Sequence, residues 1–172
     1  MNTAFLLIDA QRNMLEGDLP VPRAEQVRLT LESLLERARD AEVLVVHVQN
    51  DGGAGDPDEP HTPGWELVFD QMPGEITVPK RVGDAFLDTN LASALRAQGV
   101  TEVILAGMQS EYCILATSRG ALAGGFGVTL ASGAHATYDG GQSADEIARG
   151  VEETLAQEGV RVVPVAEICF RR

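Results

Sequence analysis

The chain of 172 residues is 44% hydrophobic and 23% charged, and it carries a formal net charge of -13 with a pI near 4.5. This length predicts a single domain over residues 1–172, and the acidic balance argues against nucleic acid or an anionic membrane surface as a partner, because both require basic patches. A cytoplasmic protein is expected, because there are only two cysteines, no basic segment precedes the short apolar run FLLI, and no apolar run approaches the ~20 residues of a membrane span.

Short apolar runs predict six strands. They are nearly continuous and rich in β-branched residues, which is typical of strands that are covered on both faces. In chain order they are AFLLI (4–8), VLVVHV (43–48), ITVP (76–79), EVILAG (102–107), GVTLA (127–131) and VRVVPV (160–165).

Helical patterns separate most of these runs. The predicted helices span residues 23–39, 88–98, 110–124 and 143–158. Asp88 or Thr89 is expected to cap the second of them, and Ser110 the third. This alternation of strands and helices predicts an α/β fold with a parallel sheet, helices on both faces and right-handed crossovers. The segment 50–74 is rich in Gly, Pro and Asp, and a loop of this length in a compact domain is usually functional or disordered.

Three reactive side chains follow predicted strands. Asp9 ends the first strand in LLIDAQ, Lys80 ends the third in TVPKR, and Cys113 lies past the fourth in AGMQSEYC. In an open α/β sheet, ligands bind outside the carboxyl ends of the strands, so we expect these side chains to converge at one edge. With Ser110 as the helix cap, Cys113 falls in the first turn of its helix.

This combination suits nucleophilic catalysis. A free thiol is only a few per cent thiolate at neutral pH, so a nucleophilic cysteine needs activation. The unpaired N–H groups at the start of a helix predict a stabilised thiolate at Cys113. Asp9 is expected to accept the thiol proton, and Lys80 to hold Asp9. The alternatives are a small buried residue for Cys113, a solvated turn residue for Asp9 and an ordinary exposed lysine for Lys80.

The longer motifs resemble one known family. The segments AFLLIDAQRNML, TPGWEL and VPKRVGDAFLDTNLASALRAQGVTEVILAGMQSEYCILATSRGALAGGFGVTLASGAHATYDG are similar to the isochorismatase-like cysteine hydrolase family. The resemblance implies a Rossmann-like, three-layer α/β/α fold with a six-stranded parallel sheet of order 3-2-1-4-5-6. It also implies a catalytic triad of Asp9, Lys80 and Cys113, and a homo-oligomer that is a dimer or a tetramer.

The same resemblance implies a special backbone before the nucleophile. The family has a cis non-proline peptide bond that corresponds to Met108–Gln109, and the backbone N–H groups of Gln109 and Cys113 are the implied oxyanion hole. Nicotinamidases of the family hold a metal with an Asp-x-His pair, whereas this chain reads HVQNDGGAGDPDEPH at that place. The resemblance is therefore to the metal-independent branch, and we expect no metal and no cofactor. His61 with the nearby aspartates is the alternative metal site.

Five further residues are candidates for the substrate pocket, and the alternative for each is ordinary packing. They are Met14, Gln49, Trp65, Tyr112 and His135. His135 is expected past the fifth strand, where it would line the pocket or pair with the cysteine. His47 is expected to be a core histidine, and Cys169 a packing residue.

These residues predict a hydrolase that cleaves a small amide-type C–N bond through a thioester on Cys113, with a small molecule as substrate. The first alternative is a vinyl ether as the cleaved group, as in isochorismatase, which does not require a thioester. Release of ammonia or of pyruvate separates these two reactions. The second alternative is a binding or redox-sensing module without catalysis.

Overall fold

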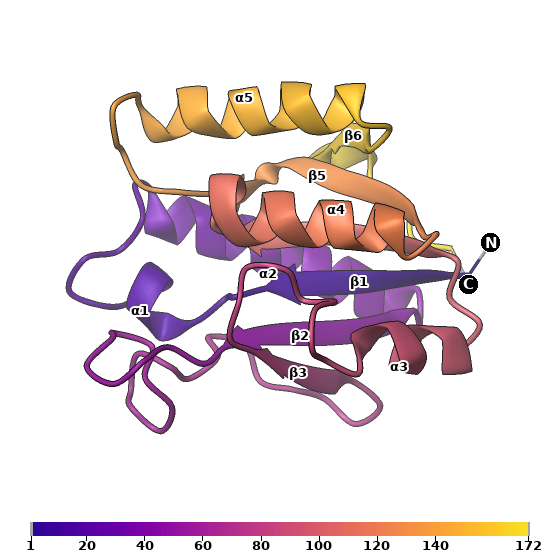
Figure 1. The fold of residues 1–172 in the computed structure, drawn as a ribbon, viewed down its shortest axis with the longest axis horizontal. Helices are drawn as coiled ribbons and strands as arrows, with labels where there is room; N and C mark the ends of the chain where they lie inside the picture. Colours follow the sequence, from indigo (N-terminus) through magenta and orange to yellow (C-terminus); the bar gives the residue numbers. More distant parts are fainter. Residues whose placement is uncertain (1, 172) are drawn as a thin grey trace.

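The computed structural model describes residues 2–171, which form a parallel sheet between two layers of helices (Figure 1). The strand order is β3-β2-β1-β4-β5-β6, and every neighbouring pair is parallel, which confirms the predicted six-stranded α/β fold. The strands are β1 (Thr3–Ile8), β2 (Leu44–Asn50), β3 (Ile76–Lys80), β4 (Glu102–Met108), β5 (Gly127–Ala136) and β6 (Arg161–Pro164).

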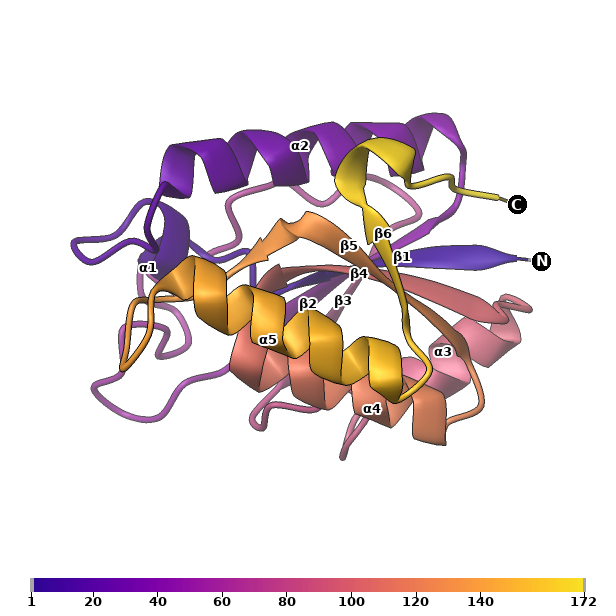
Figure 2. The same cartoon turned by 90° about the horizontal axis from the view of Figure 1, so that it is seen from above.

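The helices divide between the two faces of the sheet (Figure 2). They are α1 (Arg12–Leu15), α2 (Ala24–Asp40), α3 (Leu91–Ala97), α4 (Leu115–Ala123) and α5 (Ala144–Gln157), with a π-helical turn over Ser110–Ile114 and a 3-10 turn over Val165–Glu167. Alternate residues of the strands face opposite layers. Phe5 packs with α1 and α2, and Leu6 packs with α3, α4 and α5. The near-continuous apolar runs are thus explained by burial on both faces.

Two predicted element boundaries were wrong. The helix expected over 88–98 begins only at Leu91, with Asn90 at its N-cap. Thr89 still supports the helix start as expected, because its hydroxyl oxygen accepts the Leu91 N–H at 3.2 Å while its O–H donates to the carbonyl of Ala85. The fifth strand continues to Ala136, because Gly133 at a φ of 82° allows the chain to pass an irregularity and pair with β4 again.

The carboxyl ends of the strands share one edge of the sheet, on the left of Figure 1 with α1 and the loop between β2 and β3. Both ends of the chain lie at the opposite edge, where the N–H of Thr3 donates to the carbonyl of Arg171. Among residues 2–171, no helix combines the length and the apolar composition needed to cross a membrane.

Candidate active site

Strand register brings the reactive side chains together. Ile8 pairs with Gly107 of β4 and with Val48 of β2, so Asp9 leaves the sheet between the two strands that flank β1. Lys80 pairs with Asn50 at the end of β2. Asp9 has a φ of 48°, a left-handed conformation that aspartate tolerates better than most residues. The Asp–Lys–Cys cluster, defined as Asp9, Lys80 and Cys113, therefore sits at the carboxyl edge, as the sequence predicted.

The ammonium of Lys80 is the centre of this cluster. Its Nζ lies 2.8 Å from Asp9 Oδ2, 3.0 Å from Asn50 Oδ1 and 3.2 Å from Cys113 Sγ. The Lys80 side chain is 0% exposed and that of Asp9 is 2% exposed. The other carboxylate oxygen, Asp9 Oδ1, is buried and makes no hydrogen bond within the described residues. It is therefore available as a proton acceptor.

The electrostatics of the cluster correct one expectation from the sequence. Burial, and then the negative charge of Asp9, raise the pKa of Cys113 to about 12, against a lowering by Lys80. The resting thiol therefore keeps its proton, whereas the helix-start argument predicted a stabilised thiolate. Burial also raises the pKa of Asp9, which makes its carboxylate a stronger base. Burial is the largest single effect on Lys80 and lowers its pKa, but the charges of Asp9 and Cys113 and the hydrogen bonds to them together outweigh it. The pKa is therefore raised, and the ammonium stays protonated.

The turn that carries Cys113 also differs from the prediction. Gln109 is its N-cap and makes no side-chain cap, so Ser110 is not the cap but the first residue of a π-helical turn. The Ser110 hydroxyl is engaged elsewhere, at 2.8 Å from His135 Nδ1. The peptide bond between Met108 and Gln109 is cis, as the family resemblance implied. That the N–H groups of Gln109 and Cys113 form an oxyanion hole stays a prediction.

Gly107 leads into this turn, and no other residue fits there. Its φ is 123°, and a Cβ added to it would lie 2.0 Å from the carbonyl oxygen of Ile8. The close approach of β4 to β1 therefore depends on the absence of a side chain.

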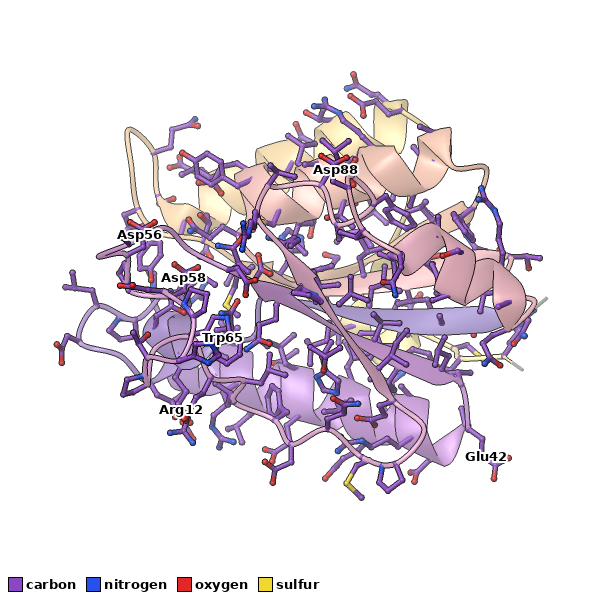
Figure 3. The ribbon with its side chains drawn as sticks, turned by 60° about the horizontal axis from the view of Figure 1, so that its bottom comes forward. Arg12, Glu42, Asp56, Asp58, Trp65 and Asp88 are labelled. Atoms are coloured by element: carbon purple, nitrogen blue, oxygen red, sulfur yellow. The ribbon has the colours of Figure 1, made fainter. Side chains whose placement is uncertain are left out.

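A hydrogen-bonded loop frames the cluster. The side-chain amides of Gln11 and Gln49 both donate to the carbonyl of Trp65, at 3.0 and 2.9 Å. The indole N–H of Trp65 donates to Asp51 at 2.8 Å. Gln49, a candidate for the substrate pocket, therefore holds the loop with its amide N–H. Figure 3 shows Trp65 among the side chains at this end of the molecule, far from Glu42.

Two supporting residues were missed in the sequence. Gln11 binds both strand and loop, because its side-chain oxygen also accepts the Asn50 N–H at 2.8 Å. Asn50 joins Lys80 to the loop, because its amide N–H donates to Asp58 at 2.7 Å. The sequence did contain a signal for Gln11 and Asn50, because both are polar residues at the ends of apolar strand runs, in LLIDAQ and HVQND.

The remaining pocket candidates lie apart from the cluster contacts. Met14 is buried in the apolar layer under α2, and Tyr112 is 62% exposed. His135 is a correction, because it lies inside β5 rather than past it and bonds Ser110 rather than the cysteine. His47 is a buried histidine 2.8 Å from Glu75, in keeping with a core role. Cys169 is exposed, so the expected packing role is wrong.

A cleft of about 800 Å³ opens at the same edge of the sheet. Its walls come from the segment after β1, the loop after β2 and the segment after β5, and its lining is mostly apolar. The lining residues are Asn13, Gly17, Asp18, Leu19, Pro20, Pro57, Gly64 and Tyr138.

Within residues 2–171, no three His, Cys, Asp or Glu side chains are grouped to hold a metal ion. Acids of the loop after β2 bind protein groups, as Asp56 accepts the Gly53 N–H.

Known proteins resemble this chain in sequence and in fold. The sequence profile of the isochorismatase domain matches residues 3–167. A streptothricin hydrolase from Streptomyces noursei is 49% identical over 138 residues, which cover 79% of this chain and 50% of the relative. A ureidoacrylate amidohydrolase from Agrobacterium fabrum is 28% identical over 137 residues, 61% of this chain and 60% of the relative. The crystal structure of an isochorismatase from Pseudomonas putida matches with a TM-score of 0.89 at 26% identity, over 98% of this chain and 90% of that one. The chain spans about half the length of the streptothricin hydrolases that it matches.

Proposed function

The chain belongs to the isochorismatase family, and from this premise we propose that it hydrolyses a small amide-type C–N bond through a thioester on Cys113. The observation that carries the proposal is the Asp–Lys–Cys cluster, with a buried ammonium within 3.2 Å of both a carboxylate and a thiol. The family relatives whose names include a hydrolase and an amidohydrolase support this class of reaction.

The first half of the reaction acylates the cysteine. Cys113 Sγ attacks the carbonyl carbon while Asp9 takes the thiol proton, as suits a protonated thiol beside a base of raised pKa. The oxyanion of the tetrahedral intermediate is held by the backbone N–H groups of Gln109 and Cys113. When the C–N bond breaks, Asp9 returns the proton to the leaving amine or ammonia, and the thioester remains.

The second half releases the acid. Asp9, again ionised, takes a proton from a water molecule that attacks the thioester carbonyl. The C–S bond then breaks, Asp9 returns the proton to sulfur, and the carboxylic acid leaves. Lys80 holds Asp9 in place in both halves and favours its ionised form before each proton transfer, because it donates to Oδ2 and leaves Oδ1 for the moving proton.

The cleft at the carboxyl edge of the sheet is proposed to bind the substrate, with its walls formed by residues outside the Asp–Lys–Cys cluster. Its volume of about 800 Å³ suits a small molecule, and its largely apolar walls, which include Leu19 and Tyr138, favour an amide with an apolar group. Trp65 is proposed to shape the inner wall.

The expected homo-oligomer also stays a proposal, and light scattering of the purified protein tests it.

The test is hydrolysis of a panel of small amides by the wild-type chain and two cysteine variants. Cys113→Ala is expected to lower kcat/KM by at least about 1,000-fold, because the variant lacks the thiol that forms the thioester. Cys169→Ala is the matched control and should retain full activity, because this exposed thiol lies at the other edge of the sheet. Acid quenching should trap a covalent adduct on Cys113 by mass spectrometry. An unchanged rate in Cys113→Ala, or pyruvate from isochorismate without ammonia from any amide, would refute the proposal.

A further inference from the structure

A chain of hydrogen bonds runs from the nucleophile turn to the surface. The Ser110 hydroxyl lies 2.8 Å from His135 Nδ1, and His135 Nε2 lies 3.0 Å from Glu152 Oε1. Ser110 is fully buried, the His135 side chain is 1% exposed, and that of Glu152 is 22% exposed. A cavity of about 380 Å³ between α2, β5 and α5 reaches the outer end of this chain at His135 and Glu152.

The chemistry of the three groups sets the direction of the two bonds. The hydrogen bond from His135 is the main cause that lowers the pKa of Glu152, so this carboxylate is ionised and only accepts. His135 must therefore donate from Nε2. In a neutral imidazole the other nitrogen, Nδ1, is then an acceptor, and it receives the hydroxyl proton of Ser110.

The inner end of this chain holds the backbone that presents the thiol. Ser110 is the first residue of the π-helical turn, three positions before Cys113. His135 pairs in the sheet with Gly107, one residue before the cis peptide bond. The imidazole thus ties the turn to β5 and, through Glu152, to α5. None of the three side chains bonds Asp9, Lys80 or Cys113 in the described structure.

We propose that Ser110, His135 and Glu152 form a positioning relay that fixes the nucleophile turn and so sets the reactivity of the Cys113 thiol. His135 and Ser110 are positioning residues and do not touch the reacting atoms. A displacement of the sulfur by a fraction of an ångström from Asp9 and Lys80 is enough to slow its attack. The relay rests on the proposed nucleophilic role of Cys113, but its effect on the thiol is measurable without any substrate.

The test is the rate at which iodoacetamide alkylates Cys113 at pH 9, measured by mass spectrometry relative to Cys169 in the same sample. Asparagine at position 135 places an amide oxygen where Nδ1 of the imidazole lies, and glutamine places its amide where Nε2 lies. His135→Asn should therefore keep the Ser110 bond and lose less than about threefold in rate. His135→Gln should lose the Ser110 bond and about tenfold in rate.

A second pair of variants tests the inner bond. Ser110→Ala should also lose about tenfold, whereas Ser110→Thr, which retains the hydroxyl, should recover most of that loss. Glu152→Ala changes only a partly exposed carboxylate of α5 and is expected to fold, with a loss of about threefold; the exposed neighbour Glu153→Ala is its matched control. With an amide that the wild type hydrolyses, Ser110→Ala should lower kcat and leave KM within about twofold.

The results separate the relay from a structural role and from the proposed reaction. Equal losses in the two His135 variants, or an unchanged alkylation rate in Ser110→Ala, would overturn the relay. A fall in rate that only follows the melting temperature across all variants would overturn it as well. Failure of the proposed hydrolysis shows separately, as activity that survives in Cys113→Ala, because alkylation depends on no substrate.

Discussion

Replacement of Lys80 by methionine leaves a buried carboxylate without its counter-ion. Methionine keeps most of the length and volume of the lysine stem, so the change removes chiefly the charge and three contacts, with Asp9, Asn50 and Cys113. Asp9 is 2% exposed and cannot recover the lost interaction from water. An unpaired buried charge of this kind is neutralised by protonation instead.

The cost of that protonation sets the size of the effect. A carboxyl of ordinary pKa 3.8 is protonated at pH 7 at a cost of about 4 kcal/mol, since each pH unit above the pKa adds about 1.4 kcal/mol. Because burial already raises the pKa of Asp9 in the wild type, this value is the upper bound of the loss. This agrees with the ~3–5 kcal/mol that follows the loss of one partner from a buried ion pair. At pH 5 the same step costs only about 1.6 kcal/mol.

The sign of the pH dependence follows from the raised pKa of Asp9. Without Lys80, the folded-state pKa of Asp9 rises further above its unfolded value, because an interaction that lowers it is gone. The fold then prefers the protonated acid. The difference in free energy of unfolding between the wild type and Lys80→Met should thus be largest above the folded-state pKa of Asp9. It should shrink as the pH falls toward 4.

The assay is urea denaturation at pH 5 and pH 7, followed by far-UV circular dichroism. The double variant Asp9→Asn/Lys80→Met should lose about 2 kcal/mol less free energy of unfolding than the two single variants lose in sum. The reason is that the double variant leaves no uncompensated charge. Arg119→Met, which breaks an ion pair between half-exposed side chains, is the control and should cost at most about 1 kcal/mol at either pH. A loss in Lys80→Met that is equal at both pH values, together with additive single variants, would refute this reasoning.

Three further predictions concern the stability of the fold. Gly107→Ala should cost more than about 4 kcal/mol or prevent folding, because its Cβ would collide with the Ile8 carbonyl; soluble yield and thermal melting measure this. Glu75→Gln should cost about 2 kcal/mol at pH 7, because hydrogen bonds that include Arg39 overcome burial and lower the pKa of Glu75 to about 2. That cost should fade between pH 4.5 and pH 2, where wild-type Glu75 becomes protonated, and a constant cost would contradict it. Ser143→Ala should cost about 1 kcal/mol in urea denaturation, because it removes the capping box of α5, and no loss would contradict it.

Hydrophobic patterns were sufficient for the six strands and the parallel sheet, because strands buried on both faces have a distinct sequence, whereas the strand order came from the family resemblance. AFLLI and EVILAG became the central pair β1 and β4 with little change in bounds. The end of β5 was missed because Ser132, Gly133 and His135 interrupt the apolar run. They remain in the sheet only because Gly133 adopts a positive φ and the strand resumes its pairing with β4.

The convergence of the Asp–Lys–Cys cluster was predictable from the sequence, and the protonation of its thiol was not. Asp9, Lys80 and Cys113 all follow strand ends, so topology alone brings them to one edge. The state of the thiol depends on burial and on the distance to Asp9, neither of which is a local property of the sequence. Serine is a common helix cap, but the hydroxyl of Ser110 is hydrogen-bonded to His135, which lies 25 positions later in the sequence.

The burial of Lys80 also determines how the molecule can be labelled and modified. Lys80 is the only lysine in the sequence, and arginine supplies the other basic charges. Its side chain is 0% exposed. Lysine-directed dyes, cross-linkers and coupling resins, and enzymes that acetylate or ubiquitinate lysine, therefore find no accessible side-chain amine on the folded chain. Reaction at Lys80 would report opening of the buried Asp–Lys–Cys cluster.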